Sequence, residues 1–348
     1  MAPFTYESVA SSLHDEASLL EVTRGVRTAL DELGGVDAEG DDPTTPHVVV
    51  VATGGTERAV LDAVDRRTAV GSDAPTLLVA HPRHNALPAA LEALAALHQS
   101  GRRGRIVVVG DGPAPEQRSA VDDLRRAIED LDAWHRLHSI RLGLVGRPSD
   151  WLVASTPDAA TVSRRWGPEL VDVAIPDAIA AFGEVPVELG RRVVERLGGS
   201  PSTTLPRPDH ADRAGRLDPA LRSVIERDDL DAITVRCFDF LGSIETSGCV
   251  ALARLNDDGI VAGCEGDVPA AVAMLWVRAL LGRPSWIANP ASIRVARDEV
   301  VLAHCTIAPS MVDDLELHAT AARSAPGFRR DDQLWLAKIE QQACQSER

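Results

Sequence analysis

The stretch "HVVVVATGGTERAVLDAV", residues 47–64, decides the fold. A continuous run of valines is typical of a strand that is buried on both faces of a sheet. The glycine pair after it makes a tight turn, and the residues that follow have apolar positions at helical spacing. The stretch therefore predicts a strand, a turn and a helix in succession, which is the repeating unit of a parallel sheet.

The segments around this stretch extend the pattern. Residues 74–112 predict a strand, a loop, a helix and a second strand, and residues 115–139 predict a long amphipathic helix. Upstream, residues 8–33 have helical spacing and end at a glycine pair, so one helix is expected there. An acidic segment with prolines, residues 37–46, is expected to be a linker.

Strand-like segments alternate with helical patterns further along the chain. They are residues 140–145, 169–175, 230–242, 259–266, 284–290 and 298–307. This alternation predicts a second parallel sheet. We therefore expect an α/β protein with two Rossmann-like parallel-sheet domains, residues 1–138 and 139–311, and a short divergent tail, residues 312–348, that has no strand pattern.

Composition excludes several classes of function. Hydrophobic residues make up 45% of the 348, which is typical of a globular chain, and the net charge of −16 argues against binding to nucleic acid or an anionic membrane. No signal peptide or membrane-spanning run is recognisable, so we expect a cytoplasmic protein. Of the 36 basic residues only Lys338 is a lysine, and strong acidity of this kind indicates a salt-adapted (halophilic) chain.

The five cysteines do not follow a metal-binding or disulfide pattern. They are Cys237, Cys249, Cys264, Cys305 and Cys344. Their number is odd and no CxxC spacing occurs, so reduced thiols are expected.

Two loops of the first predicted sheet carry polar groups. The turn from Thr53 to Glu57 could bring backbone N–H groups to a phosphate, or it could be a tight turn with Thr56 as a helix N-cap. It is neither a P-loop nor a GxGxxG motif, so a nucleotide-linked enzyme is the weakest alternative. The next loop has His81, His84 and Asn85, which suit recognition of hydroxyl groups; no nearby acid or cysteine would complete a metal site with the two histidines.

The second predicted sheet has polar groups at most of its strand ends. Ser149, Asp150 and Trp151 follow its first strand. Arg236 and Asp239 interrupt a segment that should be buried on both faces, either as a functional pair or as a structural ion pair. Because the carboxyl ends of parallel strands meet at one edge of a sheet, these groups are expected to gather at a ligand site there.

Three further strand-like segments add Glu265 with Asp267, Asn289 and His304 to this group. The paired acids allow two interpretations. Asp267 could be an N-cap, with Pro269 in the first turn of the following helix. Alternatively, carboxylates and imidazole at one edge suit a hard divalent ion such as Mn²⁺ or Mg²⁺.

Several of these motifs occur in an order that resembles the L-fucose isomerase-like family, the short relatives of fucose and arabinose isomerases. They are "ATGGTE", "HPRHNALPAALEALA", "RLGLVGRPSDWLVAS", "AITVRCFDFL", "LARLNDDGIVAGCEGDVPAAVAML" and "VLAHCTIAPSMV", between residues 46 and 315. The resemblance implies two Rossmann-like domains, then a β-rich C-terminal domain, in a homo-oligomer. It also implies manganese-dependent aldose–ketose isomerisation through an ene-diolate.

The resemblance assigns roles to individual residues. It implies Asp239 and Asp267 as metal ligands, with Glu245 as the rival of Asp239, and Asp239 and Glu265 as the catalytic acid and base. The sugar would be bound by Asn85, Ser149, Asp150, Trp151, Arg236, Asn289 and His304.

The end of the sequence departs from the family pattern. After "MVDDLELH" the family's "HFESG" is replaced by "HATAA", so the C-terminal domain and its metal-binding histidine are expected to be missing. His304, His318 or a partner subunit would then complete the metal site. The alternative is a non-catalytic sugar-binding or regulatory relative.

Overall fold

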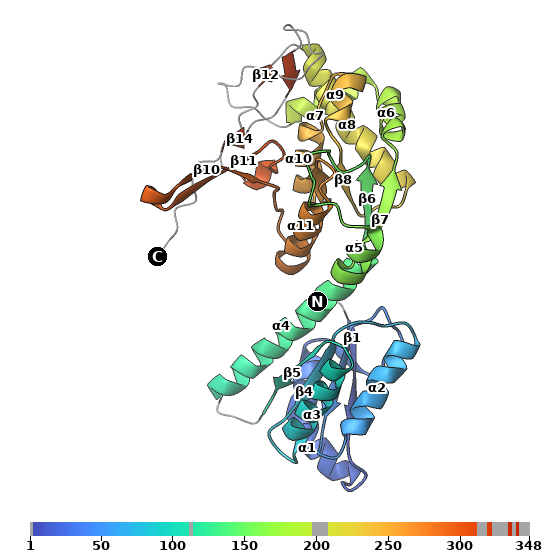
Figure 1. The fold of residues 1–348 in the computed structure, drawn as a ribbon. Coiled ribbons are helices and arrows are strands. Elements are labelled where there is room, and N and C mark those ends of the chain that lie inside the picture. Colours follow the sequence, from blue (N-terminus) through green and yellow to red (C-terminus); the bar gives the residue numbers. More distant parts are fainter. Residues whose placement is uncertain are drawn as a thin grey trace. The chain divides into compact units, whose positions relative to one another are not determined.

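The computed structural model describes residues 3–110, 114–196 and 208–311, and three short strands at 319–321, 333–335 and 339–340. The chain divides into two compact units, Met1–Arg136 and Leu137–Arg348. Each unit is described by itself (Figure 1).

The first unit is a parallel sheet between two layers of helices. Its strands are β1 (Phe4–Val9), β2 (Gly35–Asp37), β3 (His47–Val51), β4 (Thr76–Ala80) and β5 (Gly104–Val108), in the order β2-β1-β3-β4-β5. Its helices are α1 (Glu16–Glu32), α2 (Glu57–Ala69), α3 (Ala86–Gln99) and all but the last residues of α4 (Ala114–Ser139). Every strand pairs in parallel with its neighbours.

Alternation along β3 explains the layers of the first unit. Val48 and Val50 pack with residues of α1 and α4, whereas Val49 and Val51 pack with α2 and α3. Because successive side chains of a strand point to opposite faces, the valine run of the sequence is buried on both sides. This is the reason why four consecutive valines occur there.

The expected single helix over residues 8–33 is wrong at its beginning. Residues 4–9 form β1, and α1 begins at Glu16 after Asp15, whose carboxylate accepts a 2.8 Å hydrogen bond from the Ser18 N–H. Phe4 and Tyr6 point into the core, with about 1% of each exposed. These aromatic side chains anchor a strand that extends to Val9, so the helix begins later than predicted.

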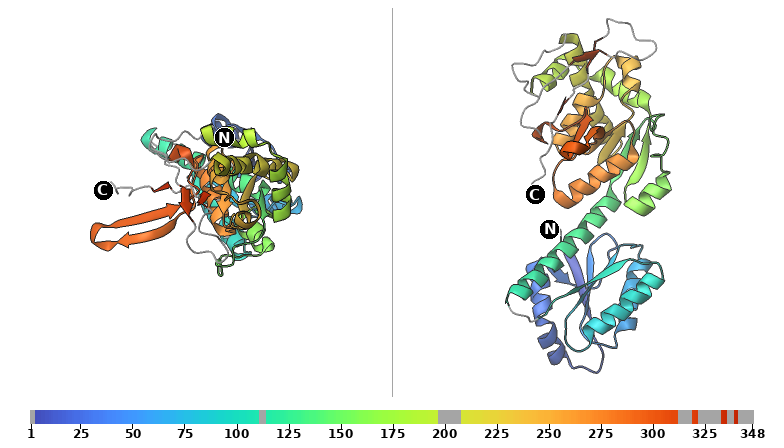
Figure 2. Two further views of the ribbon diagram at one scale, coloured as in Figure 1. Left: turned by 90° about the horizontal axis from the view of Figure 1, so that it is seen from above. Right: turned by 60° about the vertical axis from the view of Figure 1, so that its left-hand side comes forward.

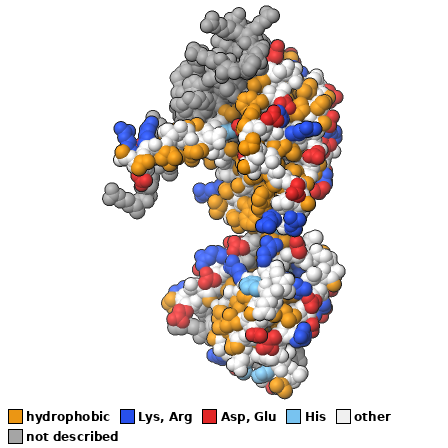
Figure 3. All heavy atoms as spheres, viewed as in Figure 1, with side chains coloured by type: hydrophobic (Ala, Val, Ile, Leu, Met, Phe, Trp, Pro, Cys, Tyr) orange, Lys and Arg blue, Asp and Glu red, His pale blue; other side chains and the backbone are white. Residues whose placement is uncertain are grey.

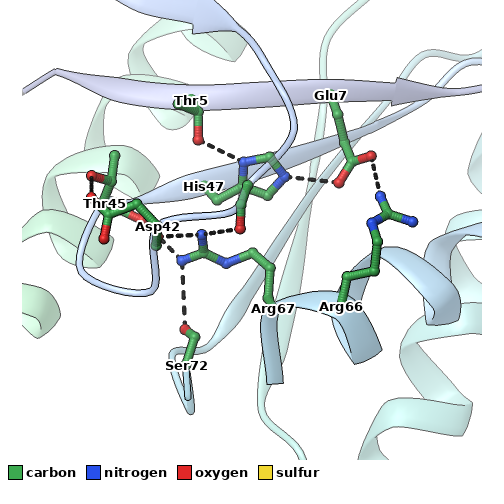
Figure 4. A network of polar contacts seen from close by, with 9 residues as sticks. Thr5, Glu7, Asp42, Thr45, His47, Arg66, Arg67 and Ser72 are labelled. Carbon is green, nitrogen blue, oxygen red and sulfur yellow. Dashed lines mark hydrogen bonds and ion pairs between the residues drawn. The ribbon is translucent and has the colours of Figure 1, made fainter. Parts of the chain in front are cut away.

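A polar network ties the segment before β3 to the sheet (Figure 4). The buried His47 ring lies 2.7 Å from Thr5 Oγ1 and 3.1 Å from a Glu7 carboxylate oxygen. Arg67 donates to the carbonyl oxygens of Gly40, Asp42 and Thr45. Since His47 begins its strand, this network lies at the amino edge of the sheet, opposite the edge where α/β folds bind ligands. We interpret it as structural.

The second unit repeats the layered plan. Its strands β6 (Arg141–Val145), β7 (Glu169–Val173), β8 (Ala232–Val235) and β9 (Ala262–Cys264) form a parallel sheet in the order β7-β6-β8-β9. Its helices are α5 (Ala159–Trp166), α6 (Ile175–Glu184), α7 (Val187–Arg196), α8 (Pro208–Arg227), α9 (Asp239–Ile244), α10 (Cys249–Asp257) and α11 (Val268–Leu281). Residues of α6, α8 and α10 cover one face, and residues of α5 and α11 cover the other. The prediction of two Rossmann-like parallel-sheet domains is thus confirmed.

The last two strands predicted for this sheet lie outside it. Strands β10 (Asn289–Arg294) and β11 (Glu299–His304) form an antiparallel hairpin in a separate sheet that includes β14 (Ile339–Glu340). Figure 2 shows the hairpin extending from the body of the second unit. Only Asn289 and Pro290 of the predicted segment 284–290 belong to a strand.

Most of the predicted tail, residues 312–348, lies outside the described residues, and so does His318. The described parts of it are the strands β12 (Ala319–Ala321), β13 (Gln333–Trp335) and β14, although no strand pattern was predicted there. Among the described helices, none is both long and apolar enough to cross a membrane.

Candidate functional site

The candidate site lies at the carboxyl edge of the second sheet, where the loops after β6, β8 and β9 meet. Backbone hydrogen bonds join these loops: Ser149 N–H donates to Glu265 O at 2.9 Å, and Gly266 N–H donates to Val235 O at 3.1 Å. Gly266 has a φ of +67°, and a Cβ there would lie 2.5 Å from the Arg147 carbonyl oxygen. Only glycine allows the two loops to approach this closely.

Arg236 fixes the loop after β6. Its guanidinium donates two hydrogen bonds to the Asp150 carboxylate, at 3.1 and 3.0 Å, one to Asp239 at 3.0 Å and one to the Pro148 carbonyl at 2.9 Å. These hydrogen bonds to Asp150 and Asp239 raise the pKa of Arg236 and lower that of Asp150. The three side chains therefore form a structural ion-pair network at the edge of the site.

The expectation that Arg236 and Asp239 interrupt a buried strand is wrong. Strand β8 ends at Val235, and Asp239 is the first residue of α9. About 20% of the Arg236 side chain and 40% of the Asp239 side chain are exposed. The charges follow the strand, so they do not have to be buried between two layers of helices.

Glu265 stands at the centre of the site. One carboxylate oxygen accepts a 2.7 Å hydrogen bond from the Trp151 indole N–H, and the other lies 3.8 Å from His304 Nε2. The backbone of Glu265 has a φ of +64°, in the left-handed region that is uncommon for a residue with a side chain. Such conformations concentrate at functional sites.

His304 reaches Glu265 from the hairpin. It is the last residue of β11, and its Nδ1 lies 3.1 Å from Thr306 Oγ1. Thr306, Ile307 and Ala308 are then buried in the second unit, with at most about 1% of each exposed. Because this short segment is buried, the His304 imidazole lies at the carboxyl edge of the parallel sheet of the second unit. Strand β11 itself does not belong to that sheet.

The pKa values of both Glu265 and His304 are shifted. Although burial lowers the pKa of His304, its contacts with Cys305 and with the Glu265 carboxylate raise it to about 9. The same contact with His304 lowers the pKa of Glu265, assisted by the Trp151 N–H. Hydrogen bonds from the Cys249 and Cys264 thiols hold the pKa of Cys305 well below its usual range. Near neutral pH the site therefore holds a carboxylate beside an imidazolium.

Asp267 is an N-cap, which was one of its two interpretations. Its carboxylate accepts a 2.9 Å hydrogen bond from the Ala270 N–H at the start of α11, with proline in the first turn. Burial, together with the nearby charge of Glu265, raises the pKa of Asp267. The side chain thus lies near Glu265 while it stabilises the helix.

The described residues do not fit a divalent ion in the way that the resemblance implies. Among them, no three His, Cys, Asp or Glu side chains are placed to hold a metal together. Asp239 is engaged by Arg236, and its rival Glu245 forms an ion pair with Arg213. Glu265 and His304 form a close pair, which is less than a complete ligand set.

Ser149 has a buried hydroxyl beside the loop of Glu265. About 2% of the residue is exposed, and its Oγ has no hydrogen-bond partner within the described part of the chain. Leaving a buried hydroxyl unpaired costs about 1–3 kcal/mol. A bound molecule with a polar group beside Glu265 would remove this cost.

Two further predicted sugar-binding residues belong to other elements of the chain. Asn85 lies in the first unit, where it has a φ of +57° at the start of α3. Asn289 is an exposed residue of β10 that pairs with Ala303. The structure thus brings together Ser149, Trp151, Glu265 and His304, with Asp150 and Arg236 beside them.

The loops of the first unit have internal partners. Gly54 N–H donates to the His84 carbonyl, and Thr56 Oγ1 donates to the Thr53 carbonyl. His81 uses both ring nitrogens, one toward the Ala52 carbonyl and one toward the Arg83 N–H. The geometry therefore favours a tight turn over a phosphate-binding loop.

Phe238 was missed by the sequence analysis. Its ring lies 5.2 Å from that of Trp151 in an edge-to-face arrangement, and 44% of Phe238 and 54% of Trp151 are exposed. Aromatic residues make up only 3% of the chain, so an aromatic residue at a strand end was a signal that could have been used. Cys305, beside His304, was missed because its neighbours come from distant segments.

Comparison with known proteins identifies sugar isomerases as similar proteins. The chain is 24% identical over 194 residues to a sulfoquinovose isomerase of Alkalicoccus urumqiensis, which covers 55% of this chain and 44% of that protein. It is 24% identical over 228 residues to that of Clostridium sp. (strain MSTE9), covering 64% and 50%, and 21% identical over 193 residues to that of Priestia aryabhattai, covering 55% and 43%. The chain thus spans about half the length of these relatives. No protein-family model matches it.

Proposed function

We propose that the second unit binds an aldose at the carboxyl edge of its sheet and interconverts it with the ketose by proton transfer. The observation that carries this proposal is the half-buried pair of Glu265 and His304: the Glu265 carboxylate, on a residue with left-handed backbone, lies 3.8 Å from the His304 imidazole. The names of the similar proteins support an aldose–ketose isomerisation.

The residues around the pair suit a sugar. The exposed rings of Trp151 and Phe238 offer apolar surface to the C–H groups of a pyranose, and the unpartnered Ser149 hydroxyl offers a hydrogen bond. The sugar class that we propose is a hexose with an anionic group at C6, because the similar proteins are named for sulfoquinovose. Arg147 is exposed in the loop after β6 and is our candidate for contacting this group.

The pair can perform both proton movements of the reaction. The Glu265 carboxylate removes the proton from C2 of the open-chain aldose, while the His304 imidazolium donates its proton to the carbonyl oxygen at C1. An enediol results. Glu265 then returns its proton to C1 as His304 takes up the proton of the C2 hydroxyl, which gives the ketose and restores both side chains.

The manganese ion implied by the family resemblance remains a prediction. Since the described side chains do not assemble a ligand set, the proton transfers are assigned to Glu265 and His304 alone. A second function, sugar binding without catalysis, is favoured by one observation. Asp239, the carboxylate that the resemblance makes both ligand and base, is occupied by Arg236.

Thermal stabilisation tests the binding step. A ligand at ten to a hundred times its Kd raises the free energy of unfolding by about 1.4–2.7 kcal/mol, and it raises the Tm accordingly. We expect sulfoquinovose or another aldohexose to raise the Tm of the wild type, and Ser149→Ala to weaken this effect. Equal stabilisation of wild type and Ser149→Ala, or none in the wild type, would contradict the proposed site.

Self-association, cytoplasmic location and salt adaptation remain predictions. One feature supports self-association: the β10–β11 hairpin exposes large apolar side chains, visible along it in Figure 3. These are Ile293, Val295, Val300 and Leu302, each at least 43% exposed. Light scattering in dilute and concentrated solution would measure the oligomeric state.

A further inference from the structure

Four cysteines form one cluster in the second unit. Cys237 follows β8, Cys264 ends β9, Cys249 begins α10, and Cys305 follows β11. The Sγ atoms of Cys237 and Cys264 are 3.0 Å apart, and those of Cys249 and Cys305 are 3.1 Å apart. The two pairs are neighbours, because Cys305 contributes to the raised pKa of Cys264.

The contacts are too short for a metal site. In a tetrahedral zinc site with Zn–S bonds of about 2.3 Å, the sulfur atoms stand roughly 3.8 Å apart. Within the described part of the chain, no group of three metal-ligating side chains is placed to hold an ion. The chemistry that contact between thiols favours is oxidation to a disulfide, whose sulfur atoms are about 2.05 Å apart.

The four cysteines of the cluster differ in their exposure to solvent. Cys237, Cys249 and Cys264 are buried, with 1–3% of each exposed, whereas Cys305 is partly exposed. A small oxidant therefore reaches Cys305 first. The partner in contact with it on α10 is Cys249, the residue that Ser247 Oγ also contacts at 3.2 Å.

We propose that Cys305 and Cys249 are a redox-sensitive pair, which a hydroperoxide oxidises to a disulfide that uncouples His304 from Glu265. Neither thiol transfers a proton in the proposed isomerisation, so the oxidation can be mapped without measuring that reaction. Its effect on sugar conversion rests on the proposed function.

The oxidation balances in two steps. The Cys305 thiolate attacks one oxygen of hydrogen peroxide, the O–O bond breaks, and a sulfenic acid and hydroxide form; the hydroxide takes up a proton to give water. The Cys249 thiol then attacks the sulfenic sulfur, an S–S bond forms and the S–O bond breaks, which releases a second water molecule. The cysteine pair loses two electrons, and one molecule of peroxide is reduced to two of water.

The geometry links this bond to the site. Bond formation shortens the Sγ–Sγ distance from 3.1 Å to about 2.05 Å, so Cys305 and Cys249 on α10 approach each other by about 1 Å in total. His304 is the preceding residue, and its Nδ1 lies 4.0 Å from the Cys305 sulfur. Because the His304–Glu265 separation is already 3.8 Å, a shift of the neighbouring residue disturbs the contact on which the proposed acid and base depend.

The experiment maps the disulfide in the full-length protein. A Cys344→Ser background removes the one cysteine outside the described residues. The folded protein is treated with hydrogen peroxide, free thiols are alkylated, and the peptides are identified by mass spectrometry. We expect a Cys249–Cys305 link that dithiothreitol reverses. Cys249→Ser should instead accumulate sulfenic acid at Cys305, and Cys237→Ser should keep the link as the matched control.

Three results would overturn the proposal. They are a Cys237–Cys264 link as the first product, a Cys305 that is oxidised further while Cys249 stays free, and absence of any oxidation of Cys305. The mapping does not depend on a sugar, so it separates this proposal from the proposed function. A mapped disulfide with no sugar conversion in the reduced protein would leave this site standing and remove the isomerase.

Discussion

The Trp151 indole N–H donates a 2.7 Å hydrogen bond to Glu265, a residue 114 positions away in the sequence. The two residues come from loops that follow different strands of one sheet. This bond orients the carboxylate whose other oxygen lies 3.8 Å from His304 Nε2. It joins the aromatic surface of the site to the proposed base.

Trp151→Phe tests this relationship. The variant keeps an aromatic ring but removes the donor, so the Glu265 carboxylate loses one hydrogen bond. Because Trp151 is 54% exposed, we expect a loss of only about 1 kcal/mol in sugar binding, which is roughly a fivefold rise in Kd. Calorimetry with an aldohexose measures it. Unchanged affinity in Trp151→Phe, with a loss in Phe238→Ala, would show that only the rings matter.

His304 is expected to titrate at about pH 9. The imidazolium is stabilised by Cys305 and Glu265 against the opposing effect of burial, so the acid form persists through neutral pH. If His304 donates the proton to the sugar, activity should fall as the pH rises through about 9. At low pH, activity should fall only below the ordinary pKa of a glutamate, because the pKa of Glu265 is lowered.

NMR of the imidazole nitrogens measures the His304 pKa without any need for activity. Glu265→Gln and Cys305→Ser should each lower this pKa, since each removes a group that favours the charged ring. His98, an exposed residue, serves as the internal reference. A wild-type His304 that titrates at its ordinary 6.5 would contradict the paired arrangement.

Arg236→Lys should loosen the loop that carries Trp151. Lysine cannot make the paired hydrogen bonds to Asp150 while it also contacts Asp239 and the Pro148 carbonyl. Since the two carboxylates are substantially exposed, we expect a cost of about 1 kcal/mol in the free energy of unfolding, measured with urea. Arg227→Lys, at an exposed pair with Asp228, should cost clearly less than Arg236→Lys. Equal costs would mean that Arg236 has no special role.

Asp267 should behave as a helix cap. Asp267→Asn keeps an oxygen that can accept from the Ala270 N–H, whereas Asp267→Ala removes it and should cost about 1 kcal/mol. Urea unfolding of the two variants measures the difference. Equal stability of the two, combined with loss of Mn²⁺ binding in both, would favour the alternative interpretation of Asp267 as a metal ligand.

Much of the fold could be predicted because buried parallel strands have a strong local signal. The valine run before the ATGGTE turn and the apolar segment before His81 are both strands of the first sheet. The beginning of the chain was mispredicted because β1 is short and its alternating pattern overlaps a helical one. The strand before Arg236 was predicted too long. It ends at Val235, so the charged side chains lie outside the sheet.

The site could be predicted only where it follows the strands. Ser149, Trp151 and Glu265 were identified from their positions after apolar runs. The position of His304 next to Glu265 depends on where the β10–β11 hairpin ends and on the burial of Ile307 and Ala308. No local sequence pattern specifies either of these. The cysteine cluster is assembled from four separate elements, so sequence spacing does not indicate it.

Exchange of the sugar C2 proton with solvent tests the central claim most directly. An aldohexose, with sulfoquinovose first, is incubated with the full-length protein in D₂O and followed by proton NMR. The account predicts loss of the C2–H signal with appearance of the ketose in the wild type, and loss of both in Glu265→Gln, a variant that keeps the size of the side chain. Exchange that continues unchanged in Glu265→Gln, or a wild type that binds the sugar without any exchange, would contradict the assignment of Glu265 as the base.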